Sequence, residues 1–351
     1  MALPTPHSPP RIHLATSIWI VEDGLVSASE AKVLSSRLPR TPLGRAGEDL
    51  LRGLSREEPL NGPAHPHWPG AMQALAQCLN TSPQALPWAA WSAQADGLQP
   101  QAGEHWGFLS TGRLHMTPQQ VRLLLQESPT DSRWREALAG GIAEELPLQL
   151  HQGASGQLYL SSAEAIEIEA MHPSLLQEVH LPDALPTGAH ARAWRKASQL
   201  ACMLTHTWSS ESGYPDALWL WGVSEVRQST RPAEHGLPPS SSSVLWTEGF
   251  RAAWAALHQR PAPRLEWQPL PTEPESGQDM VACWASHWQR CLLGLSEDAS
   301  RSGHPLLISS LKTQSRLWSP SPTPSPAWQL GLGQAPDLRS LPALLAMPET
   351  E

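Results

Sequence analysis

The stretch THTWSSESGYPDALWLWGVS, Thr205–Ser224, joins a helix to a strand and sets the pattern of the fold. Upstream of it, from Ala189 to His206, apolar residues recur at helical spacing on one face: Trp194, Ala197, Leu200, Ala201 and Leu204. After a short polar turn, the apolar run ALWLWG lies between Pro215 and Gly222. So short an apolar run, bounded by proline and glycine, predicts a buried strand. The stretch therefore predicts a helix, a turn and a core strand in succession.

Helices and strands alternate along the rest of the chain as well. A strand is predicted within RIHLATSIWIVEDG, residues 11–24, where apolar residues crowd before an Asp-Gly turn. Two short strands are predicted on either side of Thr111–Gly112. Further helices are predicted near 27–37, 65–80, 132–146, 248–258 and 279–295, and further strands at 156–161 and 305–310. This irregular alternation predicts an α/β or mixed α+β fold with a central sheet and flanking helices.

Changes in composition suggest how the chain is divided. Residues 1–10 are rich in proline and are predicted to be disordered. One α/β domain is predicted over 11–226, followed by a Pro/Ser-rich linker or surface loop over 227–243. Residues 244–351 are predicted to form a C-terminal segment of helices and strands packed on the same domain.

Composition and charge exclude several classes of protein. The chain has 351 residues and 40 % apolar residues, enough for a sizeable core. It has no run of about 18–20 apolar residues, so no membrane partner is expected. The N-terminus has prolines where a signal peptide has its apolar core, which predicts a cytoplasmic protein. A net charge of −9 without a basic cluster argues against nucleic acid, so the expected partner is a small molecule or a protein.

Two groups of residues invite a metal assignment, and for both a structural role is favoured. Cys283, His287 and Cys291 share one helical face, but the two thiols would lie about 12 Å apart along the helix axis, too far for one ion. His65 and His67 stand two apart beside prolines, a spacing that a loop could offer to a metal. No carboxylate or third histidine is near them in sequence. We therefore predict no metal site and no cofactor.

Catalytic candidates are few. Asp23 follows Glu22 at the end of a predicted strand, where α/β enzymes place metal-binding or nucleophilic carboxylates. His206 ends the helix of the opening stretch, where an imidazolium is also favoured by the helix dipole. The sequence has no Gly-x-Ser-x-Gly elbow, no Walker loop and no Gly-x-Gly-x-x-Gly after a strand. These observations favour a protein without catalytic activity.

A longer stretch around the opening one carries a family resemblance. Residues 185–222, LPTGAHARAWRKASQLACMLTHTWSSESGYPDALWLWG, resemble a bacterial family of RpfE-type regulatory proteins, also described as phosphoglycerate-mutase-like. Members have a helix, a His-Pro-Val-Asn turn and then Pro-Val-Asn-Ser-Leu-Trp-Leu-Trp-Gly-Gly-Gly. Residues 65–79 and 87–121 resemble further blocks of the family, so the resemblance covers about 40–225.

The resemblance carries an expectation about the fold and another about metals. The end of the family signature is similar to a segment of archaeal-type cofactor-independent phosphoglycerate mutases. This similarity implies a degenerate form of their alkaline-phosphatase-like fold. Those enzymes use two metal ions held by Asp and His residues and a Ser or Thr nucleophile. We could not place this set on the sequence.

The chain departs from the family at the positions that would bind a ligand. Ser209 and Asp216 stand where the family has asparagines, and the arginine of the turn is missing. Gly222 is followed by valine and serine where three glycines are expected. Ser209, Asp216 and Gly222 are therefore the candidate binding residues, and binding of an anionic ligand is expected to be weakened or lost.

The sequence therefore predicts a cytosolic, non-catalytic binding or regulatory protein on a degenerate phosphoglycerate-mutase-like scaffold. The first alternative is a metal-dependent phosphomutase or phosphatase for a small phosphorylated metabolite. It would use a divalent metal, with Asp23 or His206 as surviving groups. The second alternative is a scaffold subunit that presents tryptophan-rich C-terminal helices to a protein partner; the chain has 17 tryptophans.

Overall fold

The computed structural model describes residues 17–22, 56–58, 65–206, 214–227, 246–269, 305–311 and 314–319. The chain divides into two compact units, and neither follows a continuous boundary such as 11–226. Unit 1 comprises Met1–Ala64, Gly70–Asn80 and Leu257–Glu351, and unit 2 comprises His65–Pro69 and Thr81–Ala256. Each unit contains one five-stranded sheet with helices, so the predicted mixed α/β class is confirmed. The predicted helices at 27–37 and 279–295 lie outside the described residues, as do residues 1–10 and 228–243.

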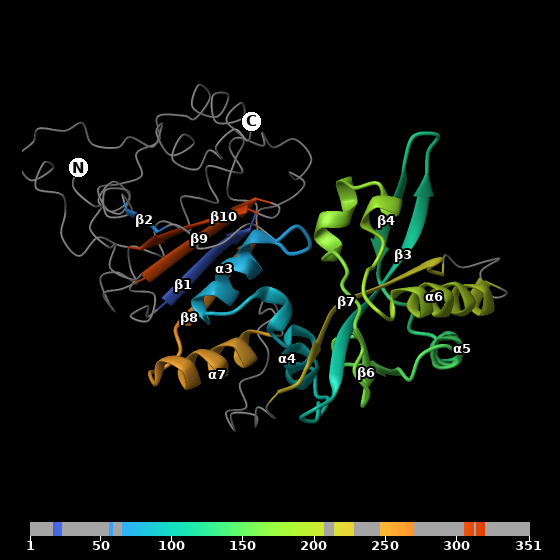
Figure 1. The fold of residues 1–351 in the computed structure, drawn as a ribbon, viewed down its shortest axis with the longest axis horizontal. Helices are drawn as coiled ribbons and strands as arrows, with labels where there is room; N and C mark the ends of the chain where they lie inside the picture. The colour runs from blue at the N-terminus through green and yellow to red at the C-terminus, as the bar shows by residue number, and fades with distance from the viewer. Residues whose placement is uncertain are drawn as a thin grey trace, which may run out of the picture. The chain divides into compact units, whose positions relative to one another are not determined.

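Strand β1, Ser17–Glu22, is an interior strand of the sheet of unit 1, next to one of its edges (Figure 1). Residues Ile18 to Val21 are all buried, as expected for a strand covered on both faces. Strand β1 runs parallel to both of its neighbours. One neighbour is an edge strand, and beyond the other the sheet continues with two antiparallel strands. The other elements are β8 (Arg264–Pro269), β9 (Pro305–Leu311), β10 (Gln314–Ser319), β2 (Arg56–Glu58) and helix α3 (Gly70–Cys78), which packs against the sheet. The predicted strands at β1 and β9 and the helix at α3 are confirmed.

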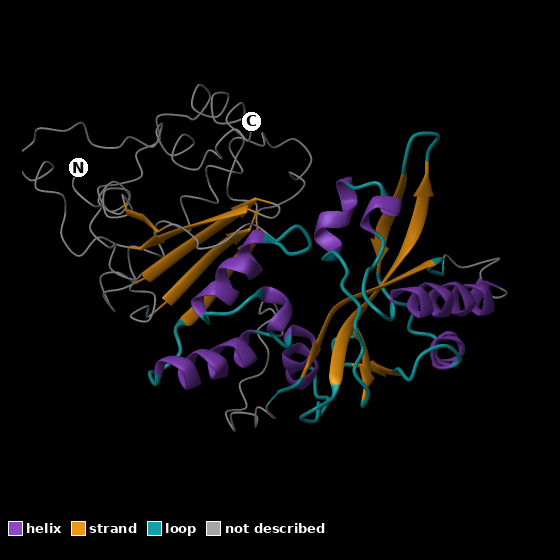
Figure 2. Cartoon of the chain, viewed as in Figure 1, coloured by secondary structure: helices purple, strands orange, loops and turns teal. Residues whose placement is uncertain are grey.

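The sheet of unit 2 is built around one long strand, β3, His105–Met116 (Figure 2). It pairs antiparallel with three strands, and a fifth strand continues the sheet beyond one of them. These strands are β4 (Val121–Gln126), β6 (Leu158–Ser162), β7 (Ala217–Glu225) and, beside β6, β5 (Gln149–Gln152).

The prediction of two short strands around Thr111–Gly112 is wrong. Both residues lie inside β3, and the chain reverses later, where Thr117 N donates to Gln120 O at 2.8 Å. Gly112 is a glycine for a different reason. A Cβ there would lie 2.6 Å from the carbonyl oxygen of Leu124, so the missing side chain lets β4 approach closely.

Four helices are described in unit 2, and α5 and α6 lie side by side (Figure 1). Asp131 caps α5 by accepting a hydrogen bond from Arg133 N at 2.9 Å. Trp134 of α5 and Trp194 of α6 are fully buried in the same core cluster. The helices are α4 (Trp88–Ala95), α5 (Ser132–Ala143), α6 (Ala191–His206) and α7 (Thr247–His258), the last belonging to unit 2 as far as Ala256. The predicted helices at α5, α6 and α7 are confirmed.

The helix and the strand of the opening stretch form as its sequence predicts. Helix α6 ends at His206, and β7 begins at Ala217; residues 207–213 between them lie outside the described part of the chain. Leu218, Trp219 and Leu220 of β7 are all buried. The apolar run is therefore a core strand, and it contributes to the centre of unit 2.

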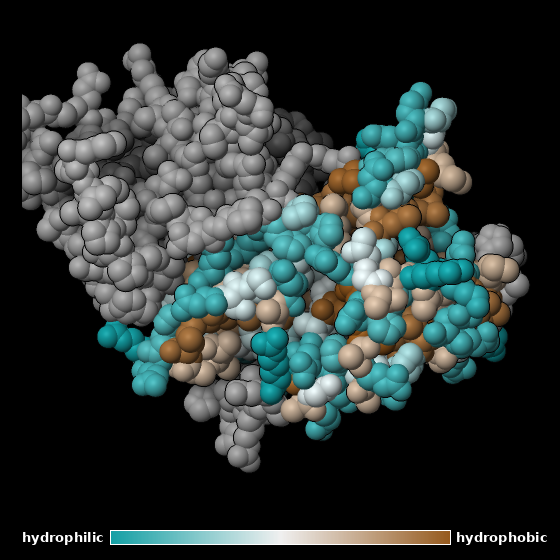
Figure 3. Space-filling view, in the orientation of Figure 1, coloured by the Kyte–Doolittle hydropathy of each residue, from teal (hydrophilic) through white to brown (hydrophobic). Residues whose placement is uncertain are grey.

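Several large apolar side chains remain exposed on unit 2. Four of them belong to the paired strands β3 and β4: Leu114, Met116, Leu124 and Leu125. Figure 3 shows apolar residues gathered in the region of these strands. In the described ranges, no helix combines the length and apolar character that crossing a bilayer demands.

Tyr159 of β6 gives a prediction about alkaline pH. It is fully buried, and its hydroxyl donates to Asp96 Oδ2 at 3.1 Å. Burial, and after it the charge and hydrogen bond of Asp96, raise the pKa of the phenol. The folded-state pKa therefore lies above the unfolded value of about 10. Its contribution to stability is full below about pH 10 and is lost as the pH rises above that value.

The measurement is the free energy of unfolding by denaturant between pH 8 and 11. Wild type should lose stability above about pH 10 more steeply than Tyr159→Phe, which has no phenol to ionise. Tyr214→Phe removes the other tyrosine, keeps Tyr159 and should retain the steep decline. Parallel curves for wild type and Tyr159→Phe would contradict the prediction.

Candidate metal centre

Two histidines come from the short turn that precedes α3. His65 and His67 alternate with prolines, and the turn is closed where Trp68 N donates to His65 O at 3.3 Å. Prolines restrict the backbone here, so the two imidazoles project from a tight, defined segment. Their side chains are 23 % and 27 % exposed, which leaves both rings reachable from solvent.

A carboxylate from a distant segment completes the group. Glu169 forms an isolated bridge with Thr187, in which each backbone N–H donates to the other residue's carbonyl at 2.9 Å. The same segment is tied to the histidine turn, because His172 N donates to His67 O at 2.8 Å. Backbone hydrogen bonds thus hold the two segments together independently of the side chains.

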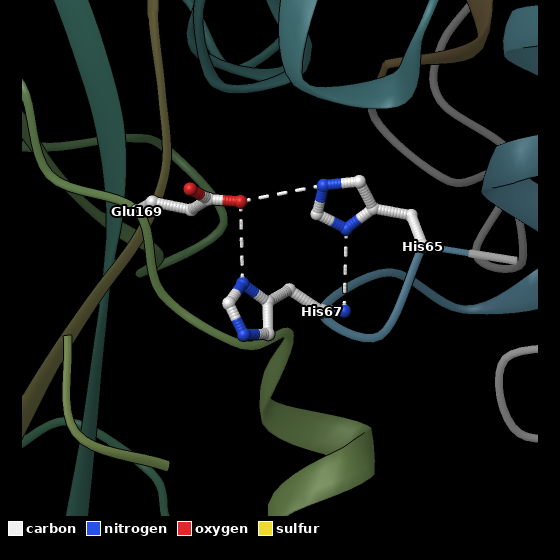
Figure 4. Close-up of polar contacts among 3 residues, drawn as sticks. All are labelled: His65, His67 and Glu169. Atoms are coloured by element: carbon white, nitrogen blue, oxygen red, sulfur yellow. Dashed lines mark hydrogen bonds and ion pairs between the residues drawn. The ribbon is translucent and has the colours of Figure 1, made fainter. Parts of the chain in front are cut away.

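The three side chains converge on one carboxylate oxygen (Figure 4). Glu169 Oε1 lies 3.3 Å from His65 Nε2 and 3.3 Å from His67 Nδ1. One ligand atom from each residue lies within 4.8 Å of the others. Tetrahedral zinc, with ligands at about 2.0–2.2 Å, sets its ligand atoms roughly 3.4 Å apart. Both histidine–carboxylate separations match that value, so small side-chain rotations would accommodate an ion.

The protonation of His65 suits a metal ligand. Burial lowers the pKa of His65, Glu169 acts in the opposite direction, and His67 lowers it further. His65 is therefore neutral at neutral pH, the form that coordinates metals. His67 N donates to His65 Nδ1 at 3.3 Å. Coordination through Nε2 would place the proton on Nδ1 and break this long hydrogen bond, a small cost beside a metal–ligand bond.

An aromatic cluster packs against Trp68 of the histidine turn. Trp221 of β7 stacks on Phe108 with ring centroids 4.3 Å apart, and it contacts the edges of Trp68 and His172. Gly222 has a φ of +65°, and a Cβ there would lie 3.2 Å from the Phe108 ring. Its role is therefore to let β7 pass this cluster, since glycine adopts positive φ without strain.

Three of the site residues predicted from the sequence lie in the described part of the chain: His206, Asp216 and Gly222. Asp216 lies next to the first residue of β7, where its carboxylate accepts from Leu114 N at 2.8 Å, and Gly222 lies in the interior of that strand. His206 is in the last turn of α6, as predicted. Asp23, Ser209 and the Cys283, His287 and Cys291 group lie outside the described residues.

Glu169 is the residue that sequence reasoning missed. It lies in EAIEIEA, residues 164–170, where Ile166, Ile168 and Ala170 are buried and the glutamates are exposed. That alternation indicates an extended segment with Glu169 facing solvent. Nothing in this alternating pattern indicates a contact with His67, which lies 102 residues away in the sequence, or with His65. Only the fold of unit 2 brings them together.

Comparisons with solved structures return neighbours of low similarity. The chain is similar to a cofactor-independent phosphoglycerate mutase from Thermoplasma acidophilum DSM 1728, with a TM-score of 0.40 and 12 % identity over 93 % of this chain and 94 % of that one. It is also similar to the PH0037 protein from Pyrococcus horikoshii, with a TM-score of 0.45 and 12 % identity over 88 % and 87 %. No protein family and no curated protein matches the sequence. Likenesses at this level carry no activity over to this chain.

Proposed function

We propose that this chain is a metal-binding protein that holds one divalent transition-metal ion, zinc in the first place, at His65, His67 and Glu169. The observation that carries the proposal is the position of Glu169 Oε1, 3.3 Å from a ring nitrogen of each histidine. Two imidazoles and one carboxylate are ligands that zinc commonly takes. With zinc bound, the site would carry a net charge of +1 and would favour an anionic ligand.

A binding or regulatory role fits this site better than two-metal phosphoryl transfer. Two-metal enzymes need enough carboxylates and histidines to hold a pair of ions about 3.5–4 Å apart. Among the residues that the structure describes, one group of three such ligands is present. We therefore propose that the metal serves to bind or sense a ligand.

The finer predictions from the sequence belong to the same proposal. They are membership of the RpfE-type regulatory family, a cytoplasmic location, and a small molecule or protein as partner. A net charge of −9 supports the further proposal that nucleic acid is not a partner.

One observation favours an enzyme as the second candidate. Three protein ligands would leave a coordination position for water, the arrangement of catalytic zinc sites. Metal-dependent hydrolysis of a small phosphorylated metabolite therefore stays as the alternative. Assays of phosphatase and mutase activity with the zinc-loaded chain, wild type against Glu169→Gln, distinguish the two: turnover that the variant loses would favour the enzyme.

The test of the metal site is zinc titration of the metal-free full chain by calorimetry. The chain has 15 histidines, so other histidines can also bind zinc. The informative measurement is therefore the change in affinity of the tightest site when a ligand residue is substituted, not the total zinc bound. His67→Ala should weaken the tightest site by about 100-fold and Glu169→Gln by at least about tenfold, since even residues that only orient metal ligands are worth 10–100-fold. Cobalt loading should give the visible absorption of a tetrahedral site in wild type.

Glu167→Gln is the matched control. It removes the same charge two residues away, from an exposed side chain outside the ligand group, and should leave zinc affinity unchanged. Glu169 is 47 % exposed, so its substitution should leave the fold intact, which circular dichroism can check. Equal zinc affinity of wild type and Glu169→Gln would rule out this site.

A further inference from the structure

A groove of about 990 Å³ opens on unit 2 between α6 and the strands β4 and β7. It is separate from the metal centre, because none of its lining residues belongs to the histidine–glutamate group. Its floor is made of buried side chains, Leu123, Trp194 and Trp219, which are 1 %, 1 % and 4 % exposed. Its size lies at the upper end of the range of about 300–1,000 Å³ typical of small-molecule sites.

The rim of the groove is apolar on one side. Leu114 of β3, Leu185 after the short helix η4 (Leu181–Ala184) and Met203 of α6 are 37 %, 41 % and 69 % exposed. Cys202 beside Met203 adds no charge, because burial, together with the nearby Asp216, raises the pKa of its thiol to about 12. An apolar chain lying in the groove would therefore meet apolar atoms on its floor and along this rim.

The N-terminal half of α6 makes the other end of the groove basic. Arg192, Arg195 and Lys196 line it and are exposed. Lys196 is paired with Glu145 at 2.7 Å, whereas Arg192 and Arg195 form no ion pair with any residue in the described ranges. Figure 3 shows strongly hydrophilic residues where α6 runs, beside the apolar residues over β3 and β4. In a chain of net charge −9, two arginines without acidic partners beside an apolar groove indicate an anionic ligand.

One acidic residue, Asp216, also lines the groove. Its carboxylate accepts from Leu114 N. A negative head group would be repelled there and attracted to Arg192 and Arg195. The charges thus fix one orientation for an elongated ligand, with its head at the start of α6 and its tail toward Met203.

We propose that this groove binds one long-chain fatty carboxylate, with its head group on Arg192 and Arg195 and its alkyl chain over Trp219 and beside Met203. Two separate features support this occupant: an apolar floor of small-molecule size, and guanidinium groups that form charge-assisted hydrogen bonds with carboxylates. The site and its ligand are independent of the metal proposal.

The test uses sodium palmitate below its micelle concentration, added to the full chain and followed by calorimetry and native mass spectrometry. We expect one palmitate per chain. The double substitution Arg192→Gln and Arg195→Gln should weaken binding at least about tenfold, and Met203→Asp should weaken it as much. Hexadecanol, which has the chain without the charge, should bind at least about tenfold more weakly than palmitate.

Matched controls lie outside the groove on the same unit. Arg133→Gln removes an exposed arginine of α5, and Met116→Asp introduces the same charge on another exposed methionine. Both should bind palmitate as wild type does, and so should Glu169→Gln, which separates this result from the metal site. The proposal is overturned by absence of palmitate binding, by equal binding of the double arginine variant, or by equal binding of hexadecanol. Self-association that Met203→Asp abolishes, without palmitate binding, would assign the groove to a second copy of the chain instead.

Discussion

Replacing Asp96 with alanine should lower the free energy of unfolding by about 2–4 kcal/mol. Asp96 caps the C-terminal end of α4 and is 5 % exposed. Its carboxylate accepts from Ser155 N at 2.6 Å, Ser155 Oγ at 2.7 Å and the Tyr159 hydroxyl at 3.1 Å. Alanine would leave these donors without their acceptor. Ser155 is exposed, so water can replace the acceptor there, but the Tyr159 hydroxyl lies in the core of unit 2 and its desolvation would no longer be offset.

Three variants measured by urea unfolding make this result specific. Ser155→Ala should cost about 1 kcal/mol, since it removes one side-chain hydrogen bond. Glu136→Ala removes a carboxylate from the exposed face of α5 and should stay within about 0.5 kcal/mol of wild type. In the Asp96→Ala background, the Ser155 substitution should cost less than it does alone, because its partner is already gone. A loss below about 1 kcal/mol for Asp96→Ala would contradict the role of this carboxylate.

Two adjacent glycines of α5 should respond to alanine in opposite directions. Gly141 faces α6, where a Cβ would lie 2.8 Å from Ala201 Cα and 3.0 Å from its nitrogen. Those are backbone atoms, so the helices must separate, and Gly141→Ala should lower the free energy of unfolding by about 1–3 kcal/mol. Gly140 is exposed and has nothing within 4 Å of the added Cβ. Gly140→Ala should raise stability by about 0.5–1 kcal/mol.

Thermal and denaturant unfolding of the two single variants measure this contrast directly. Gly140→Ala is the matched control, because it makes the same chemical change in the same helix. Equal stabilisation by both substitutions would show that helix propensity decides and that α5 and α6 do not pack as closely as described.

Some features of the fold could be predicted because they depend on neighbours in the sequence. The helical stripe that includes Trp194 and Ala201 and the apolar run at Leu218–Leu220 were sufficient to predict α6 and β7. Hydrophobic periodicity and the residues that bound an apolar run extend over only a few positions, so these predictions required no information about distant parts of the chain.

Gly112 shows where local reasoning fails. In the sequence, Thr111–Gly112 between two apolar runs is typical of a turn, yet the structure places it inside β3. Gly112 is needed because the backbone of Leu124, on the paired strand, lies too close to leave room for a side chain. Sequence cannot distinguish a glycine needed for a bend from one needed for a close approach.

The mixed α/β class, helix α6 and strand β7 follow from the sequence alone, because spacing along the chain encodes which faces are buried. Only the tertiary structure decided that Glu169 meets His65 and His67, and that Arg192 and Arg195 border an apolar groove. The physical reason is that each of these sites joins segments far apart in the chain. Their meeting depends on how sheets and helices pack, which no local pattern records.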